Sequence, residues 1–152
     1  LGRAARMDAN GDLVLTGINL RLVSGNEGPG ATNGKGNLFL GPGTSAVQVE
    51  GSHNLIIGPA HAVLGRNGVI VGSSHTSSGR YSIILGGVGS EAGQTATVVG
   101  SLFSGALGQS SVIIGGRDLW AYGPRSMLIG GQRQDSDRPD DLLIDGRPYP
   151  TE

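Results

Sequence analysis

Short apolar triplets alternate with polar, glycine-containing stretches along most of this chain. Eight such triplets begin at residues 38, 55, 69, 83, 97, 112, 127 and 142, and only Thr97 interrupts their apolar character. The first seven triplets are followed by Gly and the last by Asp145, with starts 17 residues apart at first and then 14 or 15 apart. A short, fixed period of this kind indicates a solenoid, in which one structural unit stacks on the next.

A second glycine follows each closing glycine by seven or eight residues in the units between Gly58 and Gly123. Two short strands per unit are expected, each ended by a glycine corner, because glycine adopts the positive φ that sharp corners need. Consecutive units would then stack as parallel strands about 4.8 Å apart. The sequence therefore predicts an all-β fold, a parallel β-roll or β-solenoid with coils of 14 to 15 residues.

The prediction divides the chain into three parts. Residues 1–37 form N-terminal strands, expected at 13–17 and 18–23, and a Gly-rich loop; residues 38–131 form the repeat roll; residues 132–152 form a last coil and a polar tail. Because the chain begins with Leu1, we expect it to be part of a longer protein.

Alternation along a strand sends successive side chains to opposite faces. We predict that the first and third positions of each triplet face the interior of the roll and that the middle positions face outward. An apolar column on the outside would be left in water by a monomer, so we expect a homo-oligomer, a trimer or a polymer, to cover it. The predicted oligomer interface consists of Phe39, Ile56, Ile70, Ile84, Val98, Ile113, Leu128 and Leu143.

Composition agrees with a thin, folded roll. Of the 152 residues 29 are Gly, and there are only two Phe, one Trp and three Tyr, so a thick aromatic core is excluded. The net charge is -1 and the basic residues are scattered, which argues against nucleic acid as a partner. The absence of Cys removes disulfides and thiolate metal sites, and no apolar run reaches the roughly 20 residues of a membrane span.

Three residue pairs are candidate binding sites. His61 and His75 lie 14 residues apart and should stack on adjacent coils, which makes them weak candidates for a metal site, although corner residues are usually just solvated.

Arg66 and Arg80 should stack in the same way and repel each other unless an anion, a carboxylate or a sulfated glycan lies across them; a hydrated polar edge is the alternative. Trp120 and Tyr122 are candidates for stacking on a sugar ring, with local packing or a trimer contact as the alternative.

Sequence motifs of catalysis are not found in a suitable strand-to-helix context, whether nucleophile elbow, Walker loop, zinc-protease helix or dinucleotide fingerprint. Hexapeptide acyltransferases also have Ile-Gly repeats, but their period is shorter than the seven-residue spacing of Gly58, Gly65 and Gly72. We therefore predict a protein that is not an enzyme and needs no cofactor, with a hexapeptide-type acyltransferase as a minor alternative.

Units such as Ser111–Gly115 and Tyr81–Gly86, each with a second small-x-Gly about seven residues on, resemble the head repeats of YadA-like trimeric autotransporter adhesins. The resemblance covers about residues 37–131. It implies a left-handed β-roll, three chains around one axis, and binding of host matrix, cell-surface or glycan ligands at the bacterial surface. We expect an extracellular structural or adhesive protein. The alternative is a secreted structural subunit that stacks end to end into an extracellular filament.

Overall fold

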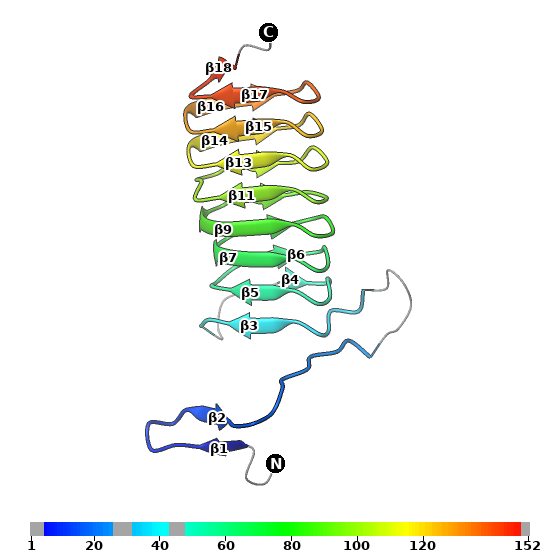
Figure 1. Ribbon diagram of the computed structural model, residues 1–152, viewed down its shortest axis with the longest axis vertical. Helices are drawn as coiled ribbons and strands as arrows, with labels where there is room; N and C mark the ends of the chain where they lie inside the picture. The colour runs from blue at the N-terminus through cyan, green and yellow to red at the C-terminus, as the bar shows by residue number, and fades with distance from the viewer. Residues whose placement is uncertain (1–4, 26–31, 43–47, 150–152) are drawn as a thin grey trace.

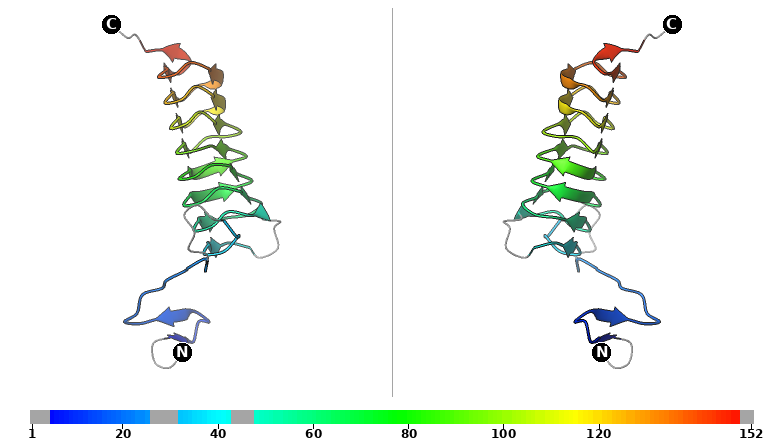
Figure 2. Two further views of the ribbon diagram at one scale, coloured as in Figure 1. Left: turned by 90° about the vertical axis from the view of Figure 1, so that its right-hand side faces the viewer. Right: turned by 90° about the vertical axis from the view of Figure 1, so that its left-hand side faces the viewer.

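The computed structural model describes residues 5–25, 32–42 and 48–149, which form strands, turns and bends without any helix. Most of these residues belong to one upright stack of coils, with the C-terminus at its upper end and a small N-terminal hairpin below its lower end (Figure 1). The stack remains narrow when it is turned by 90° in either direction (Figure 2). The predicted fold class, an all-β solenoid of parallel coils, is confirmed.

Each regular coil contributes one strand to each of two sheets. In spatial order, the nine-stranded sheet contains β18 (Arg147–Pro148), β17 (Leu142–Ile144), β15 (Met127–Ile129), β13 (Val112–Ile114), β11 (Thr97–Val99), β9 (Ile83–Val88), β7 (Val69–Ser73), β5 (Leu55–Ile57) and β3 (Leu38–Leu40). The seven-stranded sheet contains β16 (Gln132–Ser136), β14 (Arg117–Ala121), β12 (Gly105–Ala106), β10 (Glu91–Ala92), β8 (Thr76–Ser77), β6 (Ala62–Val63) and β4 (Gln48–Val49).

The strands of both sheets pair in parallel and in a register that follows the repeat. Ile70 pairs with Ile84, and Ile84 pairs with Val98, so equivalent positions of successive triplets lie directly above one another. The terminal strand β18 is the exception, because it runs antiparallel to β17. The sequence repeat thus becomes a set of straight columns of side chains.

The predicted orientation of the triplets is wrong. The middle positions are buried inside the roll, and Ile70 and Ile84 have an exposed fraction of 0%. The first and third positions lie on the outer side, where Ile83 is 37% and Leu85 is 40% exposed. Seven of the eight residues predicted to form the oligomer interface are therefore core residues of a single chain: Ile56, Ile70, Ile84, Val98, Ile113, Leu128 and Leu143.

The reason for this reversal is the small size of most residues that face the triplets across the roll. The seven-stranded sheet turns mostly small residues inward, among them Ser77, Ala92 and Ala106, which are fully buried. Close packing then leaves room for one branched side chain per coil from the opposite strand, and the middle position supplies it. Phe39, the eighth predicted interface residue, lies in β3 at the open end of the stack and is half exposed.

Glycine has two different purposes in the coil. Closing glycines such as Gly86 and Gly115 have positive φ, as the sequence predicts. Second glycines such as Gly65 do not have positive φ; there, a Cβ atom would collide with the carbonyl oxygen of Gly79 in the next coil. Close stacking of the coils, and not the turn itself, therefore requires glycine at this second position.

At the corner that precedes each triplet from β5 onward, the residue with positive φ is not a glycine. This position lies two residues before the triplet and has φ between 56° and 61°; it is occupied by His53, Asn67, Tyr81, Thr95, Ser110, Arg125 and Asp140. A left-handed conformation is unfavourable for most of these residue types. The hydrogen bonds between coils maintain it: Tyr81 N–H donates to Arg66 O at 2.9 Å, and Thr95 N–H donates to Arg80 O at 2.8 Å.

The N-terminal segment forms an antiparallel hairpin of β1 (Ala5–Met7) and β2 (Leu13–Leu15), apart from the roll (Figure 1). The strand expected at 13–17 is thus present in part, whereas the strand expected at 18–23 does not form. Residues 16–23 instead belong to no strand, and the alternating apolar side chains of Ile18, Leu20 and Leu22 are exposed. The Gly-rich loop predicted before residue 38 lies partly outside the described residues.

Candidate binding surfaces

The outer side of the nine-stranded sheet carries two parallel columns of apolar side chains, which we call the outer apolar face. It is formed by the first and third positions of the eight triplets: Leu38, Leu40, Leu55, Ile57, Val69, Val71, Ile83, Leu85, Thr97, Val99, Val112, Ile114, Met127, Ile129, Leu142 and Ile144. With rungs about 4.8 Å apart, this strip is roughly 34 Å long. A contiguous apolar strip of that length is typical of an interaction surface.

His61 and His75 are brought together, as predicted, but inside the roll and not at a solvated corner. Their ring centroids are 5.4 Å apart, their planes are inclined by 15°, and each residue is 1% exposed. Nδ1 of His61 accepts a hydrogen bond from the backbone N–H of His75 at 3.2 Å. Nδ1 of His75 accepts one from the backbone N–H of Ser90 at 3.1 Å. Nε2 of His61 lies 3.2 Å from the carbonyl oxygen of Ile57, to which it donates when Nδ1 is the acceptor.

These contacts define a structural role for the pair. A neutral imidazole that accepts at Nδ1 carries its proton on Nε2 and has no lone pair left for a metal ion. Burial lowers the pKa of His61, and burial together with the neighbouring His61 lowers the pKa of His75 to about 4. Within the described ranges, no group of three or more His, Cys, Asp or Glu residues could hold a metal ion.

Serine continues the histidine column in the coils above. The backbone N–H of Leu119 donates to Oγ of Ser104 at 3.2 Å, just as the N–H of Ser90 donates to Nδ1 of His75. In three coils, the inward side chain at this position (His61, His75 and Ser104) therefore accepts a backbone N–H of the next coil, so that serine and histidine can both make this contact. The sequence spacing predicted the stacking of the two histidines but gave no signal of this role.

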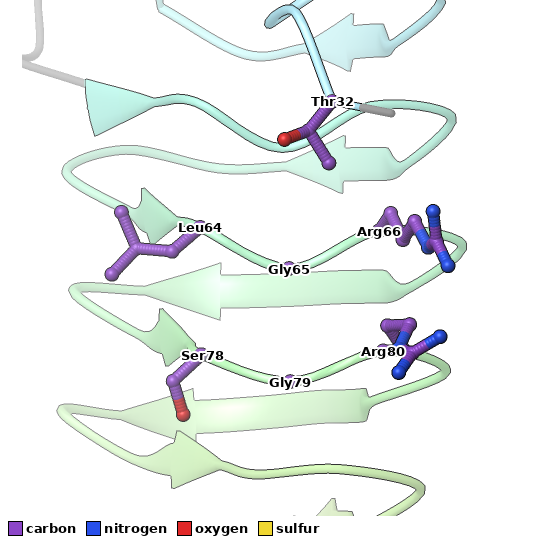
Figure 3. Close-up of a pocket in the computed structure, with 7 residues that line it drawn as sticks. All are labelled: Thr32, Leu64, Gly65, Arg66, Ser78, Gly79 and Arg80. Carbon is purple, nitrogen blue, oxygen red and sulfur yellow. The ribbon is translucent and has the colours of Figure 1, made fainter. Parts of the chain in front are cut away.

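Arg66 and Arg80 lie side by side on adjacent coils at the edge of a groove. Its floor is the backbone of Gly65 and Gly79, and its lining also includes Leu64, Ser78 and Thr32 (Figure 3). The groove encloses about 370 Å³. The prediction that the two arginines share one edge of the roll is supported by this arrangement; whether they bind an anion stays a prediction.

Trp120 and Tyr122 lie next to each other on the outer side of the seven-stranded sheet. Their ring centroids are 6.1 Å apart and their planes are inclined by only 11°. The Trp120 ring lies over Gly105 of the neighbouring coil, where a Cβ atom would collide with it. Local packing thus accounts for the position of Trp120, whereas Tyr122 is 46% exposed and stays a candidate for contact with a ligand.

Comparison with known proteins gives no assignment: a scan against protein-family models, a search of curated proteins and a search of solved structures each returned no match. The described residues also contain no helix long and apolar enough to span a bilayer. The function must therefore be inferred from the surfaces of the roll.

Proposed function

We propose that the chain is an extracellular structural or adhesive protein without enzymatic activity, and that it forms a homotrimer of left-handed β-rolls like the heads of trimeric autotransporter adhesins. The outer apolar face is the observation that carries this proposal. In the trimer, each chain turns this face toward the common axis and buries it against the other two copies. The seven-stranded sheet and the corners remain outside, where they are open to ligands.

The energetics support self-association. Full burial of a Val, Leu or Ile side chain stabilises by about 1.5–3 kcal/mol, so a side chain that is still 40% exposed gains roughly 1 kcal/mol, and a less exposed one gains a few tenths. Over the whole face of eight triplets the gross gain is on the order of 10 kcal/mol, which is comparable with the cost of association. The number three comes from the resemblance to the adhesin heads, since the same face would also fit a dimer.

The filament alternative is disfavoured by the upper end of the stack. The edge of β17 is covered by β18, which runs antiparallel to it and contains Pro148. A further molecule therefore cannot extend the parallel ladder of the nine-stranded sheet there, and Pro lacks the N–H that edge pairing needs. This cap supports a discrete assembly.

The test is the size of the protein in solution after charges are placed on the outer apolar face. Val71→Asp with Leu85→Asp should convert the trimer to monomers, because burial of unpaired carboxylates is costly. Leu64→Asp is the matched control, since Leu64 is also 40% exposed but lies beside the other sheet. Analytical ultracentrifugation should find a trimer for the wild type and the control.

A second measurement does not depend on the variants folding. The melting temperature of the wild type should rise with protein concentration, as it does for any protein stabilised by association. A wild-type protein that sediments as a monomer and melts at a concentration-independent temperature would overturn the proposed assembly. A dimer would keep the interface but reject the three-fold arrangement.

A further inference from the structure

The groove beside Arg66 and Arg80 has the features of an anion-binding site. In the described part of the chain, the ion pairs are Arg117–Asp118 and Arg125–Asp140, so neither groove arginine has a carboxylate partner there. Nε of Arg66 is buried and has no hydrogen-bond partner among the described residues. A buried donor without an acceptor is unfavourable, and so is the stacking of two like charges on adjacent coils.

The side chains around the groove can bind oxyanions but do not neutralise the arginines. Glu50 occupies the wall position one coil before Leu64; its Oε1 accepts a hydrogen bond from Gln48 Nε2 at 2.9 Å, and it makes no ion pair with either arginine. The hydroxyl of Ser78 makes only a long contact of 3.4 Å with the carbonyl oxygen of Ala92. Both arginine side chains and Ser78 line the groove, with the arginines on one side of the glycine backbone and Leu64 and Ser78 on the other (Figure 3).

The shape of the groove selects a linear ligand. Its floor is formed by Gly65 and Gly79, which carry no side chain that could block it, and the column of second glycines continues along the stack with Gly93 and Gly108. Beyond Arg80 the same edge continues with Gln94 and Gln109, which are exposed. A ligand lying along this edge would contact two guanidinium groups and then two carboxamides. A polysaccharide that carries both sulfate and hydroxyl groups has matching partners for them.

We propose that this groove binds a sulfated polysaccharide, with Arg66 and Arg80 on successive sulfate groups and Gln94 and Gln109 on the hydroxyl groups that follow. The inference rests on the proposed adhesive function, to which it gives a ligand class. A single groove makes few ionic contacts, so its affinity is modest; three grooves on one trimer raise the apparent affinity by multivalency.

The experiment measures binding of the full chain to immobilised heparin, with unsulfated dextran as the reference surface. We expect the wild type to bind heparin and not dextran, and Arg66→Gln with Arg80→Gln to weaken binding by about tenfold or more. The matched control is Arg133→Gln with Arg138→Gln, which changes the net charge equally at exposed positions in the upper coils and should stay within about twofold of the wild type. Arg80, Arg133 and Arg138 are exposed and Arg66 is half-buried, and none of the four is part of the core, so folding should be retained.

Further measurements distinguish binding at the groove from nonspecific electrostatic attraction to heparin. Arg66→Lys keeps the charge but removes the buried Nε donor and the fork, and it should weaken binding measurably. Equal losses in the two double variants, or displacement of the protein from heparin by a DNA oligonucleotide of equal charge, would overturn the proposal. Light scattering on the same samples separates this proposal from the proposed trimer. If the protein is a trimer that does not bind heparin, only the proposed ligand of the groove is wrong. If it is a monomer that binds heparin, only the proposed trimer is wrong.

Discussion

The buried histidine stack predicts that the roll loses stability in mild acid. His75 has a pKa of about 4 in the folded chain, against about 6.5 for a histidine in an unfolded chain. Because the folded pKa is the lower one, the unfolded state binds more protons between these values, and the free energy of unfolding falls as the pH drops from about 6.5 toward 4. The stabilisation at stake is about 3 kcal/mol for His75, and His61, whose pKa is also lowered by burial, adds to it.

A double variant isolates this effect from the carboxylates that titrate in the same range. We choose His61→Ser with His75→Ser, because Ser104 fills the equivalent position and its Oγ accepts the backbone N–H of Leu119. The variant should be less stable than the wild type at pH 7.5, since it loses two buried rings. Between pH 7 and pH 4.5, however, it should lose about 2–3 kcal/mol less than the wild type does.

The assay is urea unfolding followed by circular dichroism at half-unit pH steps, at one fixed protein concentration because association also contributes to stability. The slope of unfolding free energy against pH should be smaller for the variant throughout the window below pH 6.5. Parallel curves for the two proteins would refute the reasoning, because they would mean that the imidazoles titrate equally in the folded and unfolded chains.

Three further predictions test the packing of the coil. Ile84→Ala should destabilise by about 2–5 kcal/mol in denaturant unfolding, since Ile84 is fully buried; a loss below about 1 kcal/mol would place it on the outside. Gly79→Ala should lower the melting temperature more than Gly86→Ala, because a Cβ on Gly79 meets the backbone of the next coil whereas Gly86 has open space and only its positive φ is strained. Asp140→Asn should leave the melting temperature nearly unchanged, because both side chains of its ion pair with Arg125 are mostly exposed to solvent.

The sequence was sufficient to predict the stacked parallel coils because the information is local and repeated. Each triplet and each glycine recurs at nearly the same distance, and a chain with this period can satisfy its hydrogen bonds only with the coils next to it. The same period placed Arg66 beside Arg80 and His61 beside His75, which the structure also brings together. Columns of side chains are therefore predictable from a single sequence.

The direction of each column was not predictable by the same argument. Alternation separates a strand into two sets of residues, but it does not say which set faces inward when both are apolar. One signal was present in the sequence: after Phe39 the middle column contains only Ile, Val and Leu, whereas the first column accepts Thr97 and Met127. Uniform size is typical of a closely packed interior, and variation is tolerated outside.

The second glycines and the histidines illustrate a further limit of sequence analysis. Gly65 and Gly79 are needed because neighbouring coils approach closely, and this is a property of the stack and not of one turn. Similarly, His75 faces inward because its Nδ1 accepts a backbone N–H from the coil above. Contacts between coils determine both the need for these glycines and the orientation of His75, and such contacts cannot be derived from the geometry of a single coil.

The two outer faces of the roll provide an internal comparison that bears on the assembly. Folding requires only the inward side chains, so the outward ones are free to differ between the two sheets. On the seven-stranded sheet they are mixed, with Thr76, Glu91, Trp120 and Asp135 in one column. On the nine-stranded sheet both outward columns are apolar except at Thr97. Since both sheets consist of parallel strands that share one interior, strand formation does not explain the difference, and burial of one face against another copy can.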